Sequence, residues 1–265
     1  MFGFAVLLAA TPLPAYAWGS EGHRIVSAIA ADELTSLARA QVQSLLGSSN
    51  ARPAMEDAST WADEIKFQRP GTRPWHYVDI EIGTRGYDKG ADCPTGDCVV
   101  AQIERDETIL RNKKLASPVR AEALRFLIHF VGDLHQPLHC ADNHDRGGNE
   151  VKVLIGRRHE NLHAVWDVNV VQALGRDPDA VAARLEKQIM PAEIASWRRG
   201  AVEDWANETF HVAEREIYAK LSGKGGTEEP VILPLGYAKA ESGVTARQLE
   251  RAGVRLAGVL NSILR

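Results

Sequence analysis

The sequence predicts an all-α fold, a single mostly helical domain with at most a small β-hairpin. Apolar residues recur at helical spacing along most of the chain, and only residues 75–82 and 150–156 have an extended pattern. No internal repeat, low-complexity tract or linker divides the 265 residues into separate units. A hydrophobic content of 45% and a charged content of 25% are typical of a soluble globular protein with a substantial core.

The first half of the chain contains three predicted helices, each with a visible end. The pattern over residues 22–46 ends before a Gly-Ser-Ser-Asn run, and the pattern over residues 57–67 ends before an Arg-Pro-Gly run. The third helix covers residues 118–135, because Pro118 suits the first turn of a helix and Pro137 forces its end.

The second half continues the helical pattern. One helix follows Pro178 and extends to about Met190, and a longer helix follows Pro191 and extends to Leu221. A closing helix has one apolar face, formed by Leu249, Ala252, Leu256, Leu260 and Ile263.

The first 17 residues have the pattern of a secretory signal peptide. Residues 4–10 form an apolar core that is too short to span a bilayer as a helix, and Ala15-Tyr16-Ala17 is a small-x-small cleavage site. We therefore expect an exported protein, periplasmic or secreted, whose mature chain is one domain of residues 18–265.

The charge balance limits the ways in which this protein could bind nucleic acid. Lys and Arg number 31 against 35 Asp and Glu, which gives a formal net charge of -4. Proteins that bind duplex DNA through a broad basic surface need an excess of positive charge. Any activity on nucleic acid would therefore need a local source of positive charge, and bound metal is one candidate.

The cysteines fit an oxidising compartment. Cys93 and Cys98 flank a Pro-Thr-Gly-Asp turn, so a small loop closed by a disulfide is the favoured interpretation. A metal or redox site formed by the same pair is the alternative. Cys140 is left over, and a buried thiol is the usual fate of such a residue.

Histidine and aspartate residues occur at the spacing of metal ligands. Two His-Asp pairs are four residues apart, which places both side chains of a pair on one face of a helix, and zinc binds imidazole and carboxylate groups. For any single pair, a surface ion pair or a satisfied core histidine is the alternative. The first pair lies in an otherwise apolar helix, where an unpartnered ionisable group would be costly. The candidates are His129 with Asp133, His163 with Asp167, His139 after the helix end, and Asp63 and His76 upstream.

Six motifs together resemble one known family. In this order, and over nearly the whole mature chain, they are similar to motifs of the fungal S-one and P-one nucleases and their plant and bacterial relatives, which share the phospholipase C-like fold. The motifs are Trp18-Gly19-x-x-Gly22-His23, Thr60-Trp61-Ala62-Asp63, Trp75-His76-Tyr77-Val78-Asp79, the run from His129 to His139, Gly147-Gly148-Asn149, and Asn161-Leu162-His163-x-x-Trp166-Asp167.

The resemblance implies a cluster of three zinc ions (Zn²⁺). Its third site would form only after cleavage of the signal peptide frees the amine of Trp18, and the ions would concentrate positive charge in one cleft. The ligands that the resemblance implies are Asp63, His76, His129 and Asp133 for the first zinc; His139, His163 and Asp167 for the second; and His23, Asp133 as a bridge, and the amino nitrogen and carbonyl oxygen of Trp18 for the third.

The resemblance also implies a reaction. Members of this family are endonucleases that hydrolyse single-stranded DNA and RNA to products with 5′-phosphate ends, with a 3′-nucleotidase activity besides. Water activated by the zinc cluster would be the nucleophile, with Asp63 as a ligand and orienting carboxylate. Lys66 would lie against the phosphate charge. The fungal relatives have Arg at the corresponding position, and Lys cannot make the bidentate contact that Arg makes.

The residues that the resemblance assigns to substrate are Tyr77, Asp79 and Asn149. Tyr77 and Asp79 match a base-binding pair, in which an aromatic ring stacks on the base and a carboxylate accepts from its edge. Asn149 matches a phosphate contact. An unpaired base can lie on an aromatic ring whereas a paired one cannot, which explains a preference for single strands. The alternatives are a solvated Lys66, a turn role for Asn149 and core packing of Tyr77.

Two other functions are alternatives for a chain with these residues. A zinc-dependent phospholipase C or other phosphoesterase is the nearer one. Two features favour the nuclease: the phospholipases have Glu at the position that resembles Asp167, and the interval from His139 to His163 is long in this chain. A non-catalytic zinc-binding protein is the other. We expect single-stranded DNA, RNA and nucleotides as partners, a monomer with no stable protein partner, and no membrane association. His135 is interpreted as a buried structural histidine, with the orienting of a ligand carboxylate as the alternative.

Overall fold

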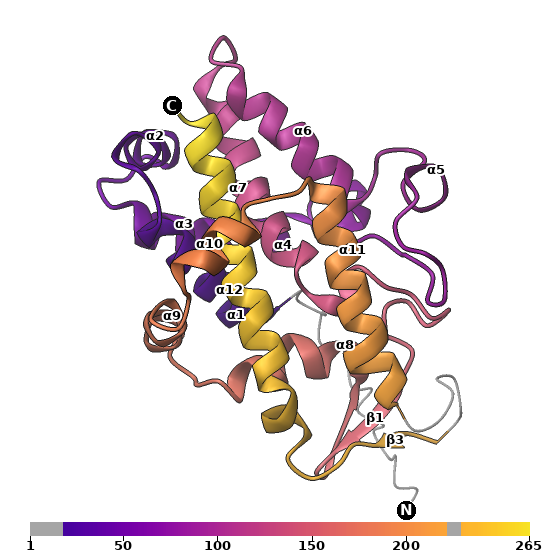
Figure 1. The fold of residues 1–265 in the computed structure, drawn as a ribbon. Coiled ribbons are helices and arrows are strands. Elements are labelled where there is room, and N and C mark those ends of the chain that lie inside the picture. Colours follow the sequence, from indigo (N-terminus) through magenta and orange to yellow (C-terminus); the bar gives the residue numbers. More distant parts are fainter. Residues whose placement is uncertain (1–17, 222–228) are drawn as a thin grey trace, which may run out of the picture.

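The structure is a computed structural model that describes residues 18–221 and 229–265. The predicted signal peptide, residues 1–17, lies outside the described residues. Figure 1 shows a mostly helical molecule with a small sheet at one end. The helices are α1 (Gly19–Asp32), α2 (Ser36–Leu46), α3 (Ala51–Ala58), α4 (Trp61–Ile65), α5 (Lys89–Asp92), α6 (Val99–Arg111), α7 (Ser117–Leu134), α8 (Leu162–Ala164), α9 (Pro178–Glu186), α10 (Pro191–Trp197), α11 (Val202–Val212) and α12 (Tyr237–Ile263).

Short helical turns and three strands complete the fold. The turns are η1 (Pro70–His76), η2 (Pro137–His139), η3 (Val165–Val170), η4 (Ala213–Ile217) and η5 (Tyr218–Lys220), and the strands are β1 (Lys152–Ile155), β2 (Arg158–Asn161) and β3 (Val231–Ile232). The predicted all-α fold with a small hairpin is confirmed. The hairpin of β1 and β2 is antiparallel, and it gains β3 as a third strand parallel to β1.

Helix α7 lies at the centre of the helical layer. It contacts α6, α12, α2, α4 and α1, and every residue from Phe126 to Leu134 is buried. A helix that is apolar on all sides is stable only when other elements enclose it. Polar side chains on this stretch must therefore find their partners inside the protein.

Helix α12 crosses the molecule beside α1 and α7 (Figure 1). The approach of α12 to α1 depends on Gly253, because a Cβ atom at this position would lie 2.5 Å from Cγ2 of Ile29. Such a contact is far inside van der Waals distance, so a larger residue would push the two helices apart. The position of α12 matters for the rest of the fold because α12 packs against α7 as well as α1.

A second, smaller hydrophobic core lies beneath the sheet. Leu138, Val153, Leu162 and Trp166 are among its fully or almost fully buried members. The indole Nε1 of Trp166 donates to the hydroxyl of Tyr237 at 3.1 Å, which links this core to the start of α12. This core holds the segments just before β1 and just after β2, and both segments carry candidate site residues.

Several predicted helices are shorter than expected. The helix predicted over residues 22–46 is interrupted at residues 33–35, where Thr35 accepts a hydrogen bond from the backbone N–H of Ala38 and begins α2. The helix predicted over residues 57–67 is divided between α3 and α4. The one predicted after Pro191 is interrupted by Gly200, which has a positive φ of 83° and separates α10 from α11.

Two segments differ in kind from the prediction. Helix α6 was not predicted, although Val99, Ile103 and Leu110 are buried on one face of it. Residues 75–82 were predicted to be extended, but they begin in η1 and make only an isolated bridge from Glu81 to Asp142. This segment is held by the backbone N–H of Val78, which donates to the carbonyl of His139 at 2.8 Å.

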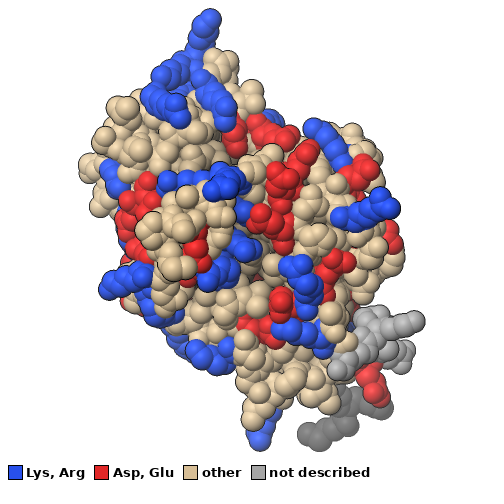
Figure 2. Space-filling model, in the orientation of Figure 1, with Lys and Arg blue, Asp and Glu red and all other residues tan. Residues whose placement is uncertain are grey.

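The surface agrees with the charge balance of the sequence. Figure 2 shows Lys and Arg side chains interspersed with Asp and Glu side chains over one face, with no broad basic area on it. Within residues 18–221 and 229–265, no helix is long and apolar enough to cross a membrane.

The carboxyl of Asp106 gives a testable prediction for stability. This side chain on α6 is 1% exposed, and its Oδ2 has no hydrogen-bond partner among the described residues. Burial raises its pKa from an ordinary 3.8 to about 8, against the opposing effect of Arg105. Folding therefore takes up a proton between these two pH values, and stability falls as the pH rises through that window.

We expect Asp106→Asn to raise the free energy of unfolding at pH 8 by about 1–3 kcal/mol and to have little effect near pH 4. Urea denaturation at the two pH values measures this difference. Glu104→Gln is the matched control, because Glu104 lies on the same helix with its side chain 43% exposed. An equal effect of Asp106→Asn at both pH values would contradict the prediction.

Candidate metal centre

Buried histidine and aspartate side chains form three groups that could hold metal ions. Within each group one donor atom from every residue lies within 4.8 Å of the others, and every member is buried. Two of the groups share His129. They are His23, His129 and Asp133; Asp63, His76 and His129; and His139, His163 and Asp167.

Asp133 lies at the meeting point of the first two groups. Its Oδ2 is 2.9 Å from Nδ1 of His76 and 3.1 Å from Nε2 of His129, and its Oδ1 is 3.3 Å from Nε2 of His23. The two carboxylate oxygens therefore face different histidines. This arrangement is what a bridging ligand requires.

Helix α7 places His129 and Asp133 on one face, one turn apart. The Nδ1 atom of His129 lies 2.6 Å from the carbonyl oxygen of Ser59. A carbonyl oxygen can only accept, so Nδ1 keeps its proton and Nε2 is the nitrogen available to a metal ion. The Nε2 atom points toward Asp133 and His76.

The same arrangement recurs at the third group. His139 donates from Nδ1 to the carbonyl of His76, and His163 donates from Nδ1 to the carbonyl of Gly147, both at 2.7 Å. Their Nε2 atoms are 3.2 Å apart. Metal-binding histidines usually donate the other ring N–H to a carbonyl or carboxylate, which fixes the tautomer and the ring orientation. The chain's own backbone thus orients three imidazole Nε2 atoms toward the centre.

His163 and Asp167 are positioned by an irregular helix. Asn161 accepts from the backbone N–H of Ala164 at 2.7 Å and begins α8, which continues directly into the π-helical turn η3. Such π-helical turns are frequent at functional sites. Nε2 of His163 lies 3.4 Å from Oδ2 of Asp167 across this junction.

Gln136 orients Asp167. Its amide Nε2 donates to Oδ1 of Asp167, and its Oε1 accepts from the backbone N–H of Leu138, both at 2.6 Å. The second contact settles which end of the amide faces the carboxylate. The alternative that His135 orients a ligand carboxylate is not supported, because His135 donates to the carbonyl of Val131 and lies 3.0 Å from Nη1 of Arg255.

Helix α1 brings His23 against α7. The rings of His23 and His129 stack at 3.9 Å, and a Cβ atom at position 132 would lie 2.8 Å from Nδ1 of His23, so this approach needs Gly132. The indole Nε1 of Trp18 donates to the carbonyl of Gly132 at 2.7 Å. The fully buried Trp18 ring therefore holds the start of α1 close to the centre. Its carbonyl accepts from the backbone N–H of Gly22 at 3.1 Å, and its role as a metal ligand stays a prediction.

The donor set fits a metal ion on two counts. Buried atoms that lack a hydrogen-bond partner among the described residues gather here, including both ring nitrogens of His23, Oδ1 of Asp133 and Oδ2 of Asp167. Uncompensated polar atoms of this kind are costly, and a cation would satisfy them. Imidazole nitrogens combined with carboxylate oxygens are also the donors that zinc prefers.

The pKa values of the ligands show strong electrostatic coupling. Burial alone would lower the pKa of His129, but Asp133 and Asp63 outweigh it and raise that pKa to about 9. Burial and His163 lower the pKa of His139 to about 3, and burial raises the pKa of Asp167 to about 6. A metal ion binding at His129 would therefore displace a proton, whereas His139 is already in the neutral form that binds metal.

A cavity of about 240 Å³ opens over these groups. Four residues to which the sequence assigned a role toward substrate line it together: Lys66, Tyr77, Asp79 and Asn149. His76, His139 and His163 also line it, so the cavity has direct contact with the metal-binding side chains. Asp63 is buried behind it, and its Oδ1 lies 2.6 Å from Nζ of Lys66.

Sequence reasoning missed three residues at this site. Gln136 lies inside the run from His129 to His139, which was identified as a motif, but its amide was given no role. Arg73 and Arg146 both line the cavity. Arg146 directly precedes Gly147-Gly148-Asn149, and that position was the available signal.

The predicted disulfide between Cys93 and Cys98 is present, and it lies outside the metal-binding groups. Cys140 is a buried free thiol, as expected.

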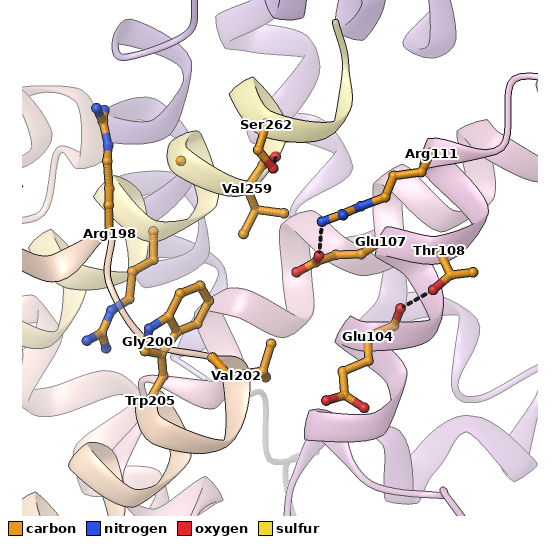
Figure 3. Close-up of a pocket in the computed structure, with 13 residues that line it drawn as sticks. Glu104, Glu107, Thr108, Arg111, Arg198, Gly200, Val202, Trp205, Val259 and Ser262 are labelled. Atoms are coloured by element: carbon orange, nitrogen blue, oxygen red, sulfur yellow. Dashed lines mark hydrogen bonds and ion pairs between the residues drawn. The ribbon is translucent and has the colours of Figure 1, made fainter.

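A second cavity of about 460 Å³ lies between α6, α11 and α12 and shares no lining residue with the first (Figure 3). Its arginines are already in ion pairs: Arg111 with Glu107 at 2.8 Å, and Arg198 with Glu33 at 2.9 Å. Figure 3 shows the pair of Arg111 and Glu107 on one helix at the edge of this cavity. We assign no function to it.

The contact between Gln136 and Asp167 generates a prediction for metal affinity. Gln136→Leu removes the donor to Oδ1 of Asp167 and frees that carboxylate to rotate. We expect affinity at the His139, His163 and Asp167 group to fall about 10- to 100-fold, measured as metal retained per chain during titration with a competing chelator. Gln102→Leu is the control, because its amide is also buried but donates to the carbonyl of Gly96, away from the centre. Equal metal retention by Gln136→Leu and Gln102→Leu would show that Gln136 does not orient Asp167 for metal.

Comparison with known proteins identifies relatives of this chain. The family model described as S1/P1 Nuclease matches residues 18–265. Endonuclease 2 of Arabidopsis thaliana is 32% identical over 94% of this chain and 91% of its own length. Nuclease P1 of Penicillium citrinum is 30% identical over 93% of this chain and 97% of its own length, and Nuclease S1 of Aspergillus oryzae is 34% identical over 58% and 55%. With its buried histidine and aspartate groups at the base of one cavity, the chain belongs to the S1/P1 nuclease family.

Proposed function

We propose that this protein is a zinc-dependent endonuclease that hydrolyses single-stranded DNA and RNA to products with 5′-phosphate ends, with a 3′-nucleotidase activity at the same site. That the chain is a nuclease follows from its family. The zinc ions, their number, the strand preference and the products are the proposal. It rests above all on one observation: three imidazoles, each fixed by a backbone carbonyl, lie close to buried carboxylates, and two of them, His139 and His163, line the same cavity as Lys66 and Tyr77.

The residues that would hold three zinc ions are the predicted ones. Bound zinc would supply a nucleophilic water at neutral pH and positive charge against the phosphate oxygens. The proposed ligands are Asp63, His76, His129 and Asp133 for the first ion; His139, His163 and Asp167 for the second; and His23, Asp133 and the amine and carbonyl of Trp18 for the third.

The remaining residues of the cavity would bind and orient the substrate. Tyr77 is 39% exposed, so its ring is free to stack on a base. Asp79 lies two residues further along the same wall of the cavity, and its carboxylate would accept hydrogen bonds from the base edge. Burial and Asp142 raise the pKa of Asp79 to about 6, so the carboxylate is mostly ionised at neutral pH.

Two polar side chains would contact the phosphate. Lys66 carries its ammonium 2.6 Å from Asp63, at the border between the metal-binding groups and the cavity. As a compact charge it would neutralise a phosphate oxygen without the bidentate geometry of an arginine. Asn149 donates from Nδ2 to the carbonyl of Arg146 at 2.9 Å, which holds the amide at the cavity wall.

Metal removal tests the proposed function. Protein beginning at Trp18 should cut single-stranded DNA to 5′-phosphate ends, lose this activity in EDTA and regain it with added zinc. Asp63→Asn should lower kcat/KM by about 10²–10³-fold, because the change removes a ligand charge next to Lys66. End-labelled oligonucleotides measure both effects. Intact DNA beside cleaved phosphatidylcholine would move the assignment to a phospholipase, and zinc-loaded protein that cuts neither would refute the catalytic proposal.

The N-terminus offers a separate test. We propose export to the periplasm or the medium, because removal of residues 1–17 frees the amine of Trp18 for the third zinc. A protein with two extra residues before Trp18 should bind one zinc fewer per chain and lose most of its activity, since an amide nitrogen is a poor ligand. Metal analysis after gel filtration measures the zinc content. The same two residues added after Arg265 are the control, and equal zinc content in the two extended proteins would contradict the proposal.

A further inference from the structure

Two arginines that line the cavity have no role in the proposed function. They are Arg73, which belongs to η1, and Arg146, which precedes Gly147. The side chain of Arg146 is 80% exposed, and its ion pair with Glu150 is a long one, 3.9 Å from Nη1 to Oε1. Exposed pairs at such a distance contribute little to stability. Arg146 is therefore available to bind an anion that enters the cavity.

The backbone that carries Arg146 is firmly built. Oδ1 of Asp142 accepts from the backbone N–H groups of Asp145 and Gly147 at 3.0 and 3.2 Å. Oδ1 of Asp145 accepts from the N–H of Gly148 and from the hydroxyl of Tyr218 at 2.8 and 2.9 Å. These contacts hold Arg146 at a positive φ of 57°, a conformation that is unfavourable for a residue with a side chain. Strain of this kind persists where the surrounding structure fixes it, and it is found mostly at functional sites.

Arg146 lies on the side of the cavity that holds the proposed base-binding pair. Its positive charge is close enough to oppose the rise that burial causes in the pKa of both Tyr77 and Asp79. Asn149 also depends on this residue, because it donates to the carbonyl of Arg146. A nucleotide stacked on Tyr77 would therefore share one cavity with the Arg146 guanidinium and with His76, His139 and His163.

The direction of the nucleic acid chain follows from the proposed reactions. Products with 5′-phosphate ends require that the bond between phosphorus and the 3′-oxygen breaks. A 3′-nucleotidase substrate has a base on only one side of the reacting phosphate, the side of the 3′-oxygen. If Tyr77 and Asp79 serve both reactions, the nucleoside on Tyr77 is the one whose 3′-oxygen leaves. Its next phosphate, in a longer strand, is attached to its own 5′-oxygen.

We propose that Arg146 binds the 5′-phosphate of the nucleotide that stacks on Tyr77 and so makes the enzyme prefer a continuing strand over a shorter substrate. This inference rests on the proposed function. A guanidinium presents a planar pair of donors to a phosphate, and such charge-assisted contacts are stronger than neutral ones. Arg146 is thus a specificity-determining residue, placed one phosphate away from the reacting one.

Two substrates that differ by one phosphate test the proposal. They are the dinucleotide dTpdT and its 5′-phosphorylated form. Zinc-loaded wild-type protein should prefer the phosphorylated form. Arg146→Ala should lower kcat/KM for the phosphorylated form about tenfold and leave that for dTpdT nearly unchanged, with the change mainly in KM, because the lost contact is a binding contact to the 5′-phosphate. Arg146→Lys keeps the charge but not the planar pair of donors, so its preference for the phosphorylated form should lie between those of wild type and Arg146→Ala.

Three controls separate the possible failures. Lys66→Ala should lower kcat/KM for both substrates by the same factor, since Lys66 is assigned to the reacting phosphate that they share. Arg176→Ala removes an exposed arginine outside the cavity lining and should leave the preference unchanged. Zinc content and thermal unfolding of each variant verify folding. If Arg146→Ala leaves the preference for the phosphorylated form as it is in wild type, the inference is overturned although the proposed function stands. If wild type cuts neither substrate, the proposed function fails and the inference fails with it.

Discussion

The buried carboxylate of Asp133 is the constraint on which the rest of the structure depends. It lies on a helix that is enclosed on all sides, where an unpaired charge would be prohibitively costly. Its partners come from three separate elements: His23 from α1, His76 from η1 and His129 from its own helix. The two elements outside α7 that supply these partners, α1 and η1, therefore each deliver a histidine to one point. Gly132 answers this need, because it lets α1 come close enough for His23 to reach the carboxylate.

The third group of the candidate metal centre is positioned in a different way. His139, His163 and Asp167 lie on short turns rather than on a long helix, so their side chains are fixed by hydrogen bonds to loops. The small core beneath the sheet makes these loops rigid, and the segment from Asp142 to Asn149 adds its own network of carboxylate-to-amide contacts. The site therefore combines ligands from a rigid helix with ligands from braced loops, and the cavity opens on the loop side.

Much of the site could be predicted from the sequence, because its ligands follow helical spacing and lie next to prolines that end helices. His129 and Asp133 are one turn apart on a helix that Pro137 ends, and His139 follows directly. Spacing alone could not show which of Gln136 and His135 contacts Asp167. They are neighbours in the turn after α7, and the direction of each side chain depends on how that turn packs against Asp167 and Arg255. Spacing rules describe regular elements and not the turns between them.

The errors in the fold prediction have similar causes. The break before α2 contains neither Gly nor Pro, and Thr35, which caps the helix, was its only signal. Helix α6 has charged residues between its buried positions, which weakens its apolar pattern. Strand β3 is two residues long and is defined by pairing with β1 rather than by its own sequence. Long-range pairing decides such elements, so a local pattern cannot reveal them.

The distribution of charge explains how an acidic protein can act on a polyanion. With a formal net charge of -4, the chain as a whole gains nothing from attracting nucleic acid at long range. Its positive groups at the cavity, Lys66, Arg73 and Arg146, act only at short range, over a few phosphates. A duplex is stiff and keeps its bases paired and stacked, so it could not place a base on Tyr77 while its phosphates enter the cavity. A flexible single strand can do both. In the proposed function, a local cluster of positive charge combined with one exposed aromatic ring would therefore select for single strands without a broad basic surface.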